Sequence, residues 1–335
     1  MLKLTNRLVP LLFLVTLMQG CSTLGTRGVD DIVPLDKTVV ELPEDQLLDV
    51  WVEIFDPGEL PEDEDDAMGL SMDIREAEAR YLPEQLRATM ESTGYWGAVR
   101  LVPQDTAGSE LLVTGTILES DGENLVLEIR AQDATGKEWL KRTYSSEVEY
   151  TQYRLDSRKG DDVFQPLYNT IANDLAELRA KLEPRESVTI RRVASLRFAS
   201  DLAPTAFDGY LQADEDQYEV VRLPAVDDPM YRRVQAIRDR DFLLIDTLNG
   251  HFDNFTREMQ HPYTEWRKAR SEEAAALRKL ERDAMQRKLL GVAAIIGAIA
   301  IEATGNGSGA SSSVLRDTLV LGGAYAFKTG MDKSA

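Results

Sequence analysis

The sequence predicts an α+β fold: a small mixed or antiparallel sheet with packed helices, followed by an α-helical hairpin domain and a Gly/Ala-rich C-terminal helix pair. Three observations predict it. Apolar residues alternate between about residues 111 and 150, as they do in strands with one buried face. They recur every three or four positions from 161 to 182, and again from 230 onward, as in amphipathic helices. The length of 335 residues fits about two domains.

The α+β part alternates strands and helices with clear boundary residues. Pro57-Gly58 ends the first strand, Pro83 is expected to open a new turn, Gly94 is a C-cap and Pro184 ends the last helix. The expected strands cover residues 47–55, 96–103, 111–118, 125–131 and 137–144, with Val148 and Tyr150 extending the sheet. The expected helices cover about residues 74–90 and 161–182.

The three-stranded meander of this part carries two short motifs, Val113-Thr114-Gly115-Thr116-Ile117 and Asp133-Ala134-Thr135-Gly136. Together with the order strand, helix, strand, meander, helix, they resemble a recurrent periplasmic fold. Similar domains occur in the TolB N-terminal region, the curli-secretion lipoprotein and the lipoprotein activators of penicillin-binding proteins. The resemblance covers about residues 45–182. It implies a module that binds other proteins, which is an analogy at the level of the fold.

The second half of the chain reads as helical. A short helix is expected over 188–199, and Asp227-Asp228-Pro229 supplies the cap and first turn of a long one. His261-Pro262 is predicted to break that helix, so that a second helix from Tyr263 folds back as a coiled-coil hairpin. The apolar residues of the first helix lie almost entirely on one stripe, which Asp241 interrupts and Gly250 weakens: Met230, Val234, Ile237, Leu244, Leu248, Phe252, Phe255 and Met259.

Two charged segments have open interpretations. Residues 267–288 hold eight basic and four acidic side chains, which favours a charged helix face with intrahelical pairs, for example around Glu281. The alternative is contact with an acidic partner, with phosphate-bearing lipid or with an acidic loop of the protein itself. The acidic run 62–66 predicts a solvated loop, with calcium binding as its alternative.

The C-terminal region contains two apolar segments, 289–301 and 314–327, around a Gly/Ser linker. The first spans about 20 Å as a helix, too short for an ordinary bilayer crossing. Small residues stand four apart within these segments, which lets helices approach closely. Three interpretations are open: a self-packed hairpin, a protein or oligomer contact, and shallow membrane insertion. The candidate contact residues are Leu289, Ala293, Gly297, Gly322 and Ala326.

The N-terminus has the features of an export signal. Lys3 and Arg7 precede an apolar run over 8–17, after which Gly20-Cys21 marks the boundary to a polar chain. The segment resembles a bacterial lipoprotein signal, although Met18 and Gln19 are unusual in it. The resemblance implies that Cys21 becomes the acylated N-terminus and binds membrane lipid, and that Ser22 directs the protein to the outer membrane. A conventional secretory peptide with a chance Cys is the alternative.

Composition and motifs argue against several classes of function. A net charge of −20 argues against nucleic-acid binding, and two His with one Cys leave little for zinc or thiol chemistry. The common nucleophile, zinc and phosphate motifs are absent from the sequence, and His251 and His261 are too far apart for a metal pair on one helical turn. We therefore expect no enzyme and no cofactor.

The sequence thus predicts a lipid-anchored outer-membrane protein facing the periplasm, an accessory or scaffold that binds unidentified envelope proteins. One alternative is an oligomeric envelope channel or secretion component, since the sequence does not decide whether the chain forms homo-oligomers. Another is a cell-wall-acting enzyme that uses paired carboxylates. The expected organisation is a signal peptide over 1–20, a tether over 21–40, an α+β domain over 41–184, a helical domain over 185–303, a linker over 304–313 and an apolar helix over 314–335.

Overall fold

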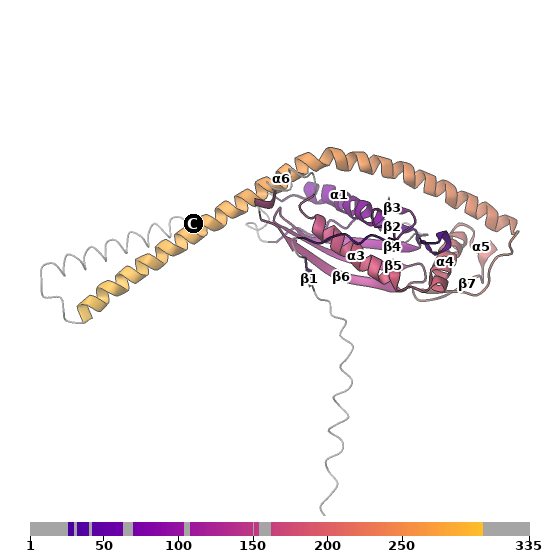
Figure 1. Cartoon of the computed structure of the whole chain (residues 1–335), viewed down its shortest axis with the longest axis horizontal. Coiled ribbons are helices and arrows are strands. Elements are labelled where there is room, and N and C mark those ends of the chain that lie inside the picture. The colour runs from indigo at the N-terminus through magenta and orange to yellow at the C-terminus, as the bar shows by residue number, and fades with distance from the viewer. Residues whose placement is uncertain are drawn as a thin grey trace, which may run out of the picture. The chain divides into compact units, whose positions relative to one another are not determined.

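A six-stranded mixed sheet with packed helices, followed by the long helix α6, makes up the fold (Figure 1). The computed structural model describes residues 26–29, 32–39, 42–62, 70–103, 108–149, 151–153 and 162–303, with side chains up to residue 289. The chain forms two compact units. Unit 1 comprises the chain up to Ser120, Asn124–Glu147 and Phe164–Met259, and unit 2 comprises Asp121–Glu123, Val148–Val163 and the chain from Gln260.

The sheet has the strand order β1-β6-β5-β4-β2-β3. Strands β4, β5 and β6 form the predicted antiparallel meander, whereas β2 runs parallel to both β3 and β4, and β1 runs parallel to β6. The mixed sheet with packed helices is therefore confirmed. The strands are β1 (Thr26–Gly28), β2 (Val50–Glu53), β3 (Val99–Val102), β4 (Leu111–Ser120), β5 (Asn124–Asp133) and β6 (Glu138–Glu147). Tyr150 lies outside the described residues.

Helices α1 (Met72–Glu91) and α3 (Gln165–Ala180) lie side by side and pack against the sheet (Figure 1). The apolar face of each is buried, which the three- and four-residue spacing predicted. The fully buried residues include Leu82, Leu86 and Met90 of α1, and Leu167, Ile171 and Leu175 of α3. Pro83 lies inside α1 and does not open a new turn, because both its neighbours, Leu82 and Glu84, are buried.

Helix α4 (Pro184–Leu202) is longer than the predicted short helix, because Pro184 ends one helix and starts the next through a capping box of Glu183 and Glu186. A one-turn helix, α5 (Pro204–Phe207), follows. The hairpin β7 (Leu211–Asp214) and β8 (Gln217–Val220) was not predicted. Its turn contains Glu215, the single described non-glycine residue with positive φ, at 53°.

Helix α6 (Pro229–Ala303) is one continuous helix, so the predicted break at His261-Pro262 and the hairpin built on it are wrong. A proline in a helix removes one backbone hydrogen bond and costs about 3 kcal/mol. The residues that follow it offset that cost: Tyr263 and Arg267 are buried within unit 2, and Arg267 bonds Asp162 at 3.0 Å.

Most residues of the apolar stripe of α6 are not buried. Among its eight residues only Val234 is fully buried, whereas Met230, Leu244 and Leu248 are exposed. The helix instead turns polar residues such as Arg238 and Asn249 inward. Asn249 bonds both backbone groups of Leu101 in β3, and Arg238 bonds Ser195 and pairs with Glu110, which reduces the penalty of burying these groups.

Candidate functional site

The most unusual feature of unit 1 is a polar contact between residues 238–253 of α6 and the sheet with its helix α1. We call it the α6 polar interface. Its α6 side chains, from the helix start onward, are Arg238, Asp246, Asn249 and Asp253, and their partners are Glu110, Arg100, Leu101 and Arg87. Helices usually pack through apolar residues. A polar contact of this kind is therefore a candidate functional site as well as a packing contact.

The helix start is fixed before the polar contacts begin. The backbone N–H groups of Met230 and Tyr231 donate to Asp228 Oδ1 at 2.8 and 2.9 Å, as in an N-cap, and Pro229 occupies the first turn. Val234 then packs in an apolar cluster with Leu196 of α4. The first two turns of α6 are therefore held by a cap and by apolar burial.

A buried ion pair follows. Arg238 Nη2 lies 3.7 Å from Glu110 Oε1, and its Nη1 donates to Ser195 Oγ at 2.6 Å. Glu110 Oε2 accepts the backbone N–H of Asp49 at 2.9 Å. Burial raises the pKa of Glu110 and lowers that of Arg238, and the attraction between the two groups opposes both shifts.

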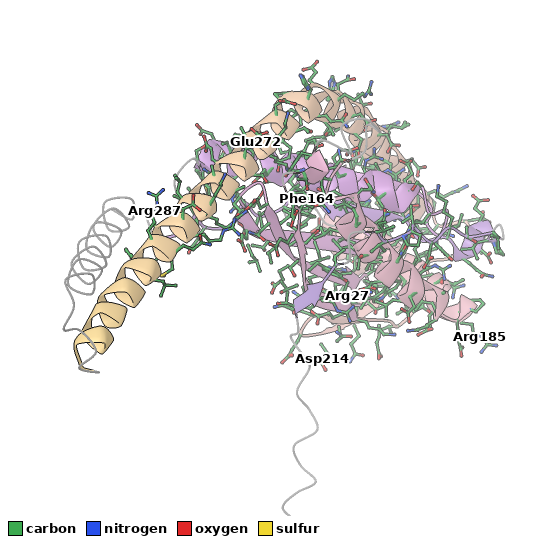
Figure 2. The ribbon with its side chains drawn as sticks, turned by 60° about the vertical axis from the view of Figure 1, so that its left-hand side comes forward. Arg27, Phe164, Arg185, Asp214, Glu272 and Arg287 are labelled. Carbon is green, nitrogen blue, oxygen red and sulfur yellow. The ribbon has the colours of Figure 1, made fainter. Side chains whose placement is uncertain are left out.

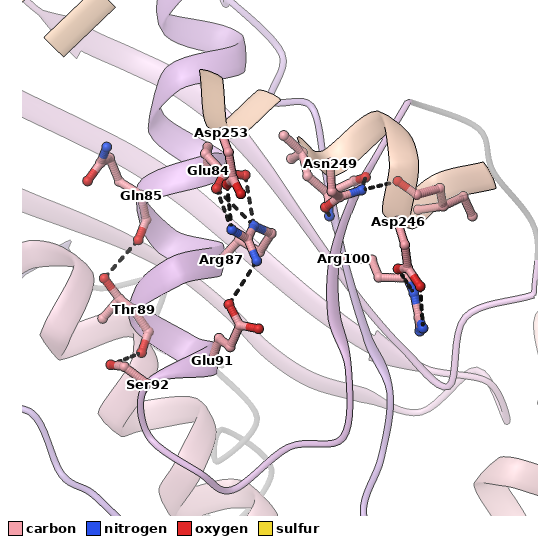
Figure 3. Close-up of polar contacts among 12 residues, drawn as sticks. Glu84, Gln85, Arg87, Thr89, Glu91, Ser92, Arg100, Asp246, Asn249 and Asp253 are labelled. Carbon is pink, nitrogen blue, oxygen red and sulfur yellow. Dashed lines mark hydrogen bonds and ion pairs between the residues drawn. The ribbon is translucent and has the colours of Figure 1, made fainter. Parts of the chain in front are cut away.

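The middle of the interface contacts β3, the last strand of the sheet (Figure 3). Arg100 Nε donates to Asp246 Oδ1 at 2.7 Å, and its Nη1 to Asp49 Oδ2 at 3.0 Å. Asn249 accepts the backbone N–H of Leu101 at 2.7 Å and donates to the same residue's carbonyl at 2.8 Å. One amide side chain thus takes both hydrogen bonds that a further strand would take there.

The last part of the interface joins α6 to α1 (Figure 3). Arg87 bonds three carboxylates: Nη2 donates to Glu84 at 2.6 Å and to Asp253 at 2.9 Å, and Nη1 donates to Glu91 at 2.9 Å. Burial raises the pKa of Glu84 to about 7, a shift that Asp253 reinforces and Arg87 opposes. Burial acts to lower the pKa of Arg87, but the hydrogen bond to Glu84 and the charges of Glu84, Glu91 and Asp253 together outweigh this and raise it.

This geometry supports fastening a helix better than catalysis. Glu84 can exchange a proton near neutral pH, but it is 3% exposed and already bonded to Arg87, so a substrate has no route to it. Glu110 is equally enclosed. Among the described residues, no cluster of three or more His, Cys, Asp or Glu has the geometry to hold a metal ion.

A cavity of about 470 Å³ lies elsewhere in unit 1, between α4, α5 and the hairpin β7–β8. Arg197, Asp201, Phe207 and Tyr218 are among its lining residues. The Arg197 guanidinium is already engaged, because it lies 4.2 Å over the Tyr218 ring and donates to the Ala134 carbonyl at 2.9 Å. These two contacts hold the Arg197 guanidinium in place beside the cavity.

In unit 2, the basic stretch of α6 contacts acidic residues of the protein itself. Ser271 and Arg278 both bond the Glu123 carboxylate, which follows β4, and Arg267 stacks 3.9 Å from the Tyr263 ring. Arg270–Glu273, at 3.4 Å, is an intrahelical pair of the predicted kind. Side chains along this stretch, such as Glu272 and Arg287, point outward from the helix (Figure 2).

Apolar side chains are also exposed on this part of α6. Leu277 is 56% exposed and Leu280 is 48% exposed. Met285 and Leu289 are each more exposed than Leu277. These four residues, called the unit 2 apolar residues below, include one predicted contact residue, Leu289. Ala293 and Gly297 lie in the α6 backbone, where the side chains are not described. Cys21, Gly322, Ala326 and residues 63–69, with most of the acidic run, lie outside the described residues.

The α6 polar interface was missed from the sequence, although a signal exists. Asp246, Asn249 and Asp253 recur at spacings of three and four, which places them on one helix face. That polar face is the one that contacts β3 and α1, although Asn249 alone among these three side chains is buried. Periodicity identifies two faces of a helix, and charge partners elsewhere in the fold decide which one turns inward.

No known protein family, curated protein or solved structure matches this chain. Within the part of the chain that the structure describes, none of the helices has an apolar stretch of the length and purity needed to cross a bilayer. The function must therefore be inferred from the site and the sequence.

Proposed function

We propose that this chain is a non-catalytic, lipid-anchored protein of the outer membrane that faces the periplasm and serves an envelope machine as an accessory or scaffold. The observation that carries the proposal is the set of unit 2 apolar residues. Four large apolar side chains on one stretch of helix are each about half exposed or more, and two of them, Leu277 and Leu280, are neighbours on the helix surface, which supports contact with another protein.

The mounting of the helix supports a binding role. Arg267 and Ser271 are buried in unit 2, and their bonds to Asp162 and Glu123 fix the helix just before the unit 2 apolar residues. A contact surface on a fixed helix loses less conformational freedom on binding than one on a mobile segment. The exposed leucines are thus presented in a preorganised form.

The anchor is proposed from the sequence. Cys21 stands at the boundary of a segment that resembles a lipoprotein signal, and it is the single Cys of the chain. Acyl chains on that residue would hold the protein at a membrane without a spanning helix. Labelling with a palmitate analogue tests this point: the wild-type chain is expected to take up the label, and Cys21→Ser is expected to lose both the label and membrane fractionation.

Site-specific photo-crosslinking in intact cells tests the binding role. A photoreactive residue at Leu277 or Leu280 is expected to yield the same envelope-protein adduct. Lys279 is the matched control, since it is exposed and lies between the two leucines on a different side of the helix. Leu280→Glu should then abolish the adduct formed from position 277. The proposal fails if no adduct forms, or if position 279 gives the same adduct in equal yield.

A further inference from the structure

The part of α6 that belongs to unit 1 has an apolar stripe beside its polar interface. Four of the eight apolar residues named above for this side of the helix are called the stripe below: Ile237, Leu244, Leu248 and Phe255. Leu244 is 60% and Leu248 39% exposed, and the other two are partly buried. Their spacings of seven, four and seven keep them on one line along the helix for about five turns. This is the spacing of a helix that packs against another helix.

The stripe is symmetric about Asp246. Ile237 and Phe255 each stand nine residues from that position, and Leu244 and Leu248 each stand two residues from it. When a second α6 is laid alongside in the antiparallel direction, Ile237 meets Phe255 and Leu244 meets Leu248. The same contacts then occur twice, which is the requirement for a two-fold symmetric interface.

The charges beside the stripe have the same symmetry. Arg233 lies 13 residues before Asp246 and Glu258 12 residues after it, and the 25 residues between them make about seven turns. Both side chains are therefore on the same flank of the stripe, and both are exposed. An antiparallel pair brings Arg233 of each copy next to Glu258 of the other. In a parallel pair this flank of one copy lies on the opposite side of the interface from the same flank of the other, so Arg233 and Glu258 would not meet each other.

We propose that the stripe Ile237–Leu244–Leu248–Phe255 binds a second copy of this chain, as an antiparallel helix pair with its two-fold axis near Asp246 and an Arg233–Glu258 ion pair at each end. Charge complementarity favours this occupant and this direction. A lipid surface is disfavoured, because Glu258 and Asp241 flank the stripe, whereas helices that bind anionic membranes carry mainly basic residues there. The proposal does not depend on the proposed function or on the unit 2 apolar residues.

Sedimentation equilibrium of the full chain in a density-matched detergent tests the pairing. The wild-type chain is expected to dimerise. Arg233→Glu and Glu258→Arg each place like charges together at both ends and should raise the dimer Kd about tenfold or more. The double variant restores opposite charges and should return the Kd to within about threefold of the wild type. Arg257→Glu is the matched control, because it makes the same charge change on an exposed residue away from the stripe.

The charge exchange separates the proposal from a folding defect, since each single variant alters a surface side chain and the double variant contains both changes. A wild-type chain that stays monomeric at about 100 μM would overturn the proposal, because helix pairs of this kind reach micromolar affinity. Two single variants that weaken dimerisation without recovery in the double variant would overturn it as well.

Cysteine crosslinking tests the direction. Differently tagged Arg233→Cys and Glu258→Cys chains, produced together and treated with a short bismaleimide, should give predominantly the mixed adduct. Adducts of 233 with 233 and of 258 with 258 would contradict the proposal, as would an adduct with a different protein in place of the second copy. Failure of the Leu277 photo-crosslinking would reject the proposed function and leave this pairing untouched.

Discussion

Helix α3 and the first part of α6 both belong to unit 1, yet different interactions hold them in place. Helix α3 buries an apolar face that includes Leu167, Ile171 and Leu175. The unit 1 part of α6 buries Arg238 and Asn249 and leaves Leu244 exposed. Apolar burial is non-directional and tolerates small shifts, whereas hydrogen-bonded charges require defined partners. The comparison teaches that α3 supplies stability and that α6 is placed in one specific position.

Removal of apolar volume from α3 should have the largest effect. Leu175→Ala is expected to lower the free energy of unfolding by about 2–5 kcal/mol, because the side chain is fully buried and leaves a cavity. Urea denaturation followed by circular dichroism measures it. A loss below about 1 kcal/mol would mean that α3 is not the apolar anchor of the unit.

Breaking the ion pair at α1 should cost nearly as much. Arg87→Met leaves Glu84 buried without its cation and should destabilise the protein by about 3 kcal/mol at pH 8. Combining it with Glu84→Leu should recover most of that loss, since the uncompensated charge is gone. Arg80→Met on the exposed side of α1 is the control and should change little. If the double variant is no better than Arg87→Met, charge compensation is not what Arg87 provides.

A smaller effect is expected from pH. Burial raises the pKa of Glu84 from 4.5 to about 7, so between these values the folded protein keeps a proton that the unfolded chain has released. The stabilisation from Glu84 is therefore present below about pH 4.5 and is lost as the pH rises through 7, by about 1–3 kcal/mol. Arg87, Glu91 and Asp253 are the charged groups that contact this site.

Glu84→Gln isolates that contribution, because it removes the titrating group and nearly keeps its shape. The difference in unfolding free energy between the wild type and Glu84→Gln should change in favour of the variant from pH 5 to pH 8. A difference that is constant over this range, or that changes in the opposite sense, would show that Glu84 does not titrate there.

The smallest effect is expected at the exposed side of α6. Leu243→Ala makes the same chemical change as Leu175→Ala, but Leu243 is 67% exposed, so a loss below about 0.5 kcal/mol is expected. Urea denaturation under identical conditions compares the two. Equal losses at positions 175 and 243 would remove the distinction between the two helices.

The predictability of this fold from sequence differs between the same two regions. The meander and the α3 helix follow from short-range periodicity, because the strands of a meander pair with their neighbours in sequence. The inward face of α6 depends on partners 146–166 residues away, such as Arg100 with Asp246 and Arg87 with Asp253. No local pattern contains that information, and an apolar stripe was the wrong guide.

Two further errors have local causes. The predicted break assumes that Pro262 is as unfavourable here as in an isolated helix. Burial of Tyr263 and Arg267 outweighs the free-energy cost of the proline. The hairpin β7–β8 was missed because its acidic turn suggested a loop. The alternation of Leu211 and Ala213 with Tyr218 and Val220 across Asp214-Glu215-Asp216 could have revealed it.

The two hydrogen bonds between Asn249 and Leu101 affect how the edge of the sheet can contact other copies of this protein. A sheet whose last strand presents free backbone groups can recruit strands from other molecules and grow into fibres. At β3 the Asn249 side chain occupies the N–H and the carbonyl of Leu101, and at the opposite end the sheet closes with the three-residue β1. Both features shorten the backbone that each edge can offer to a strand of another molecule.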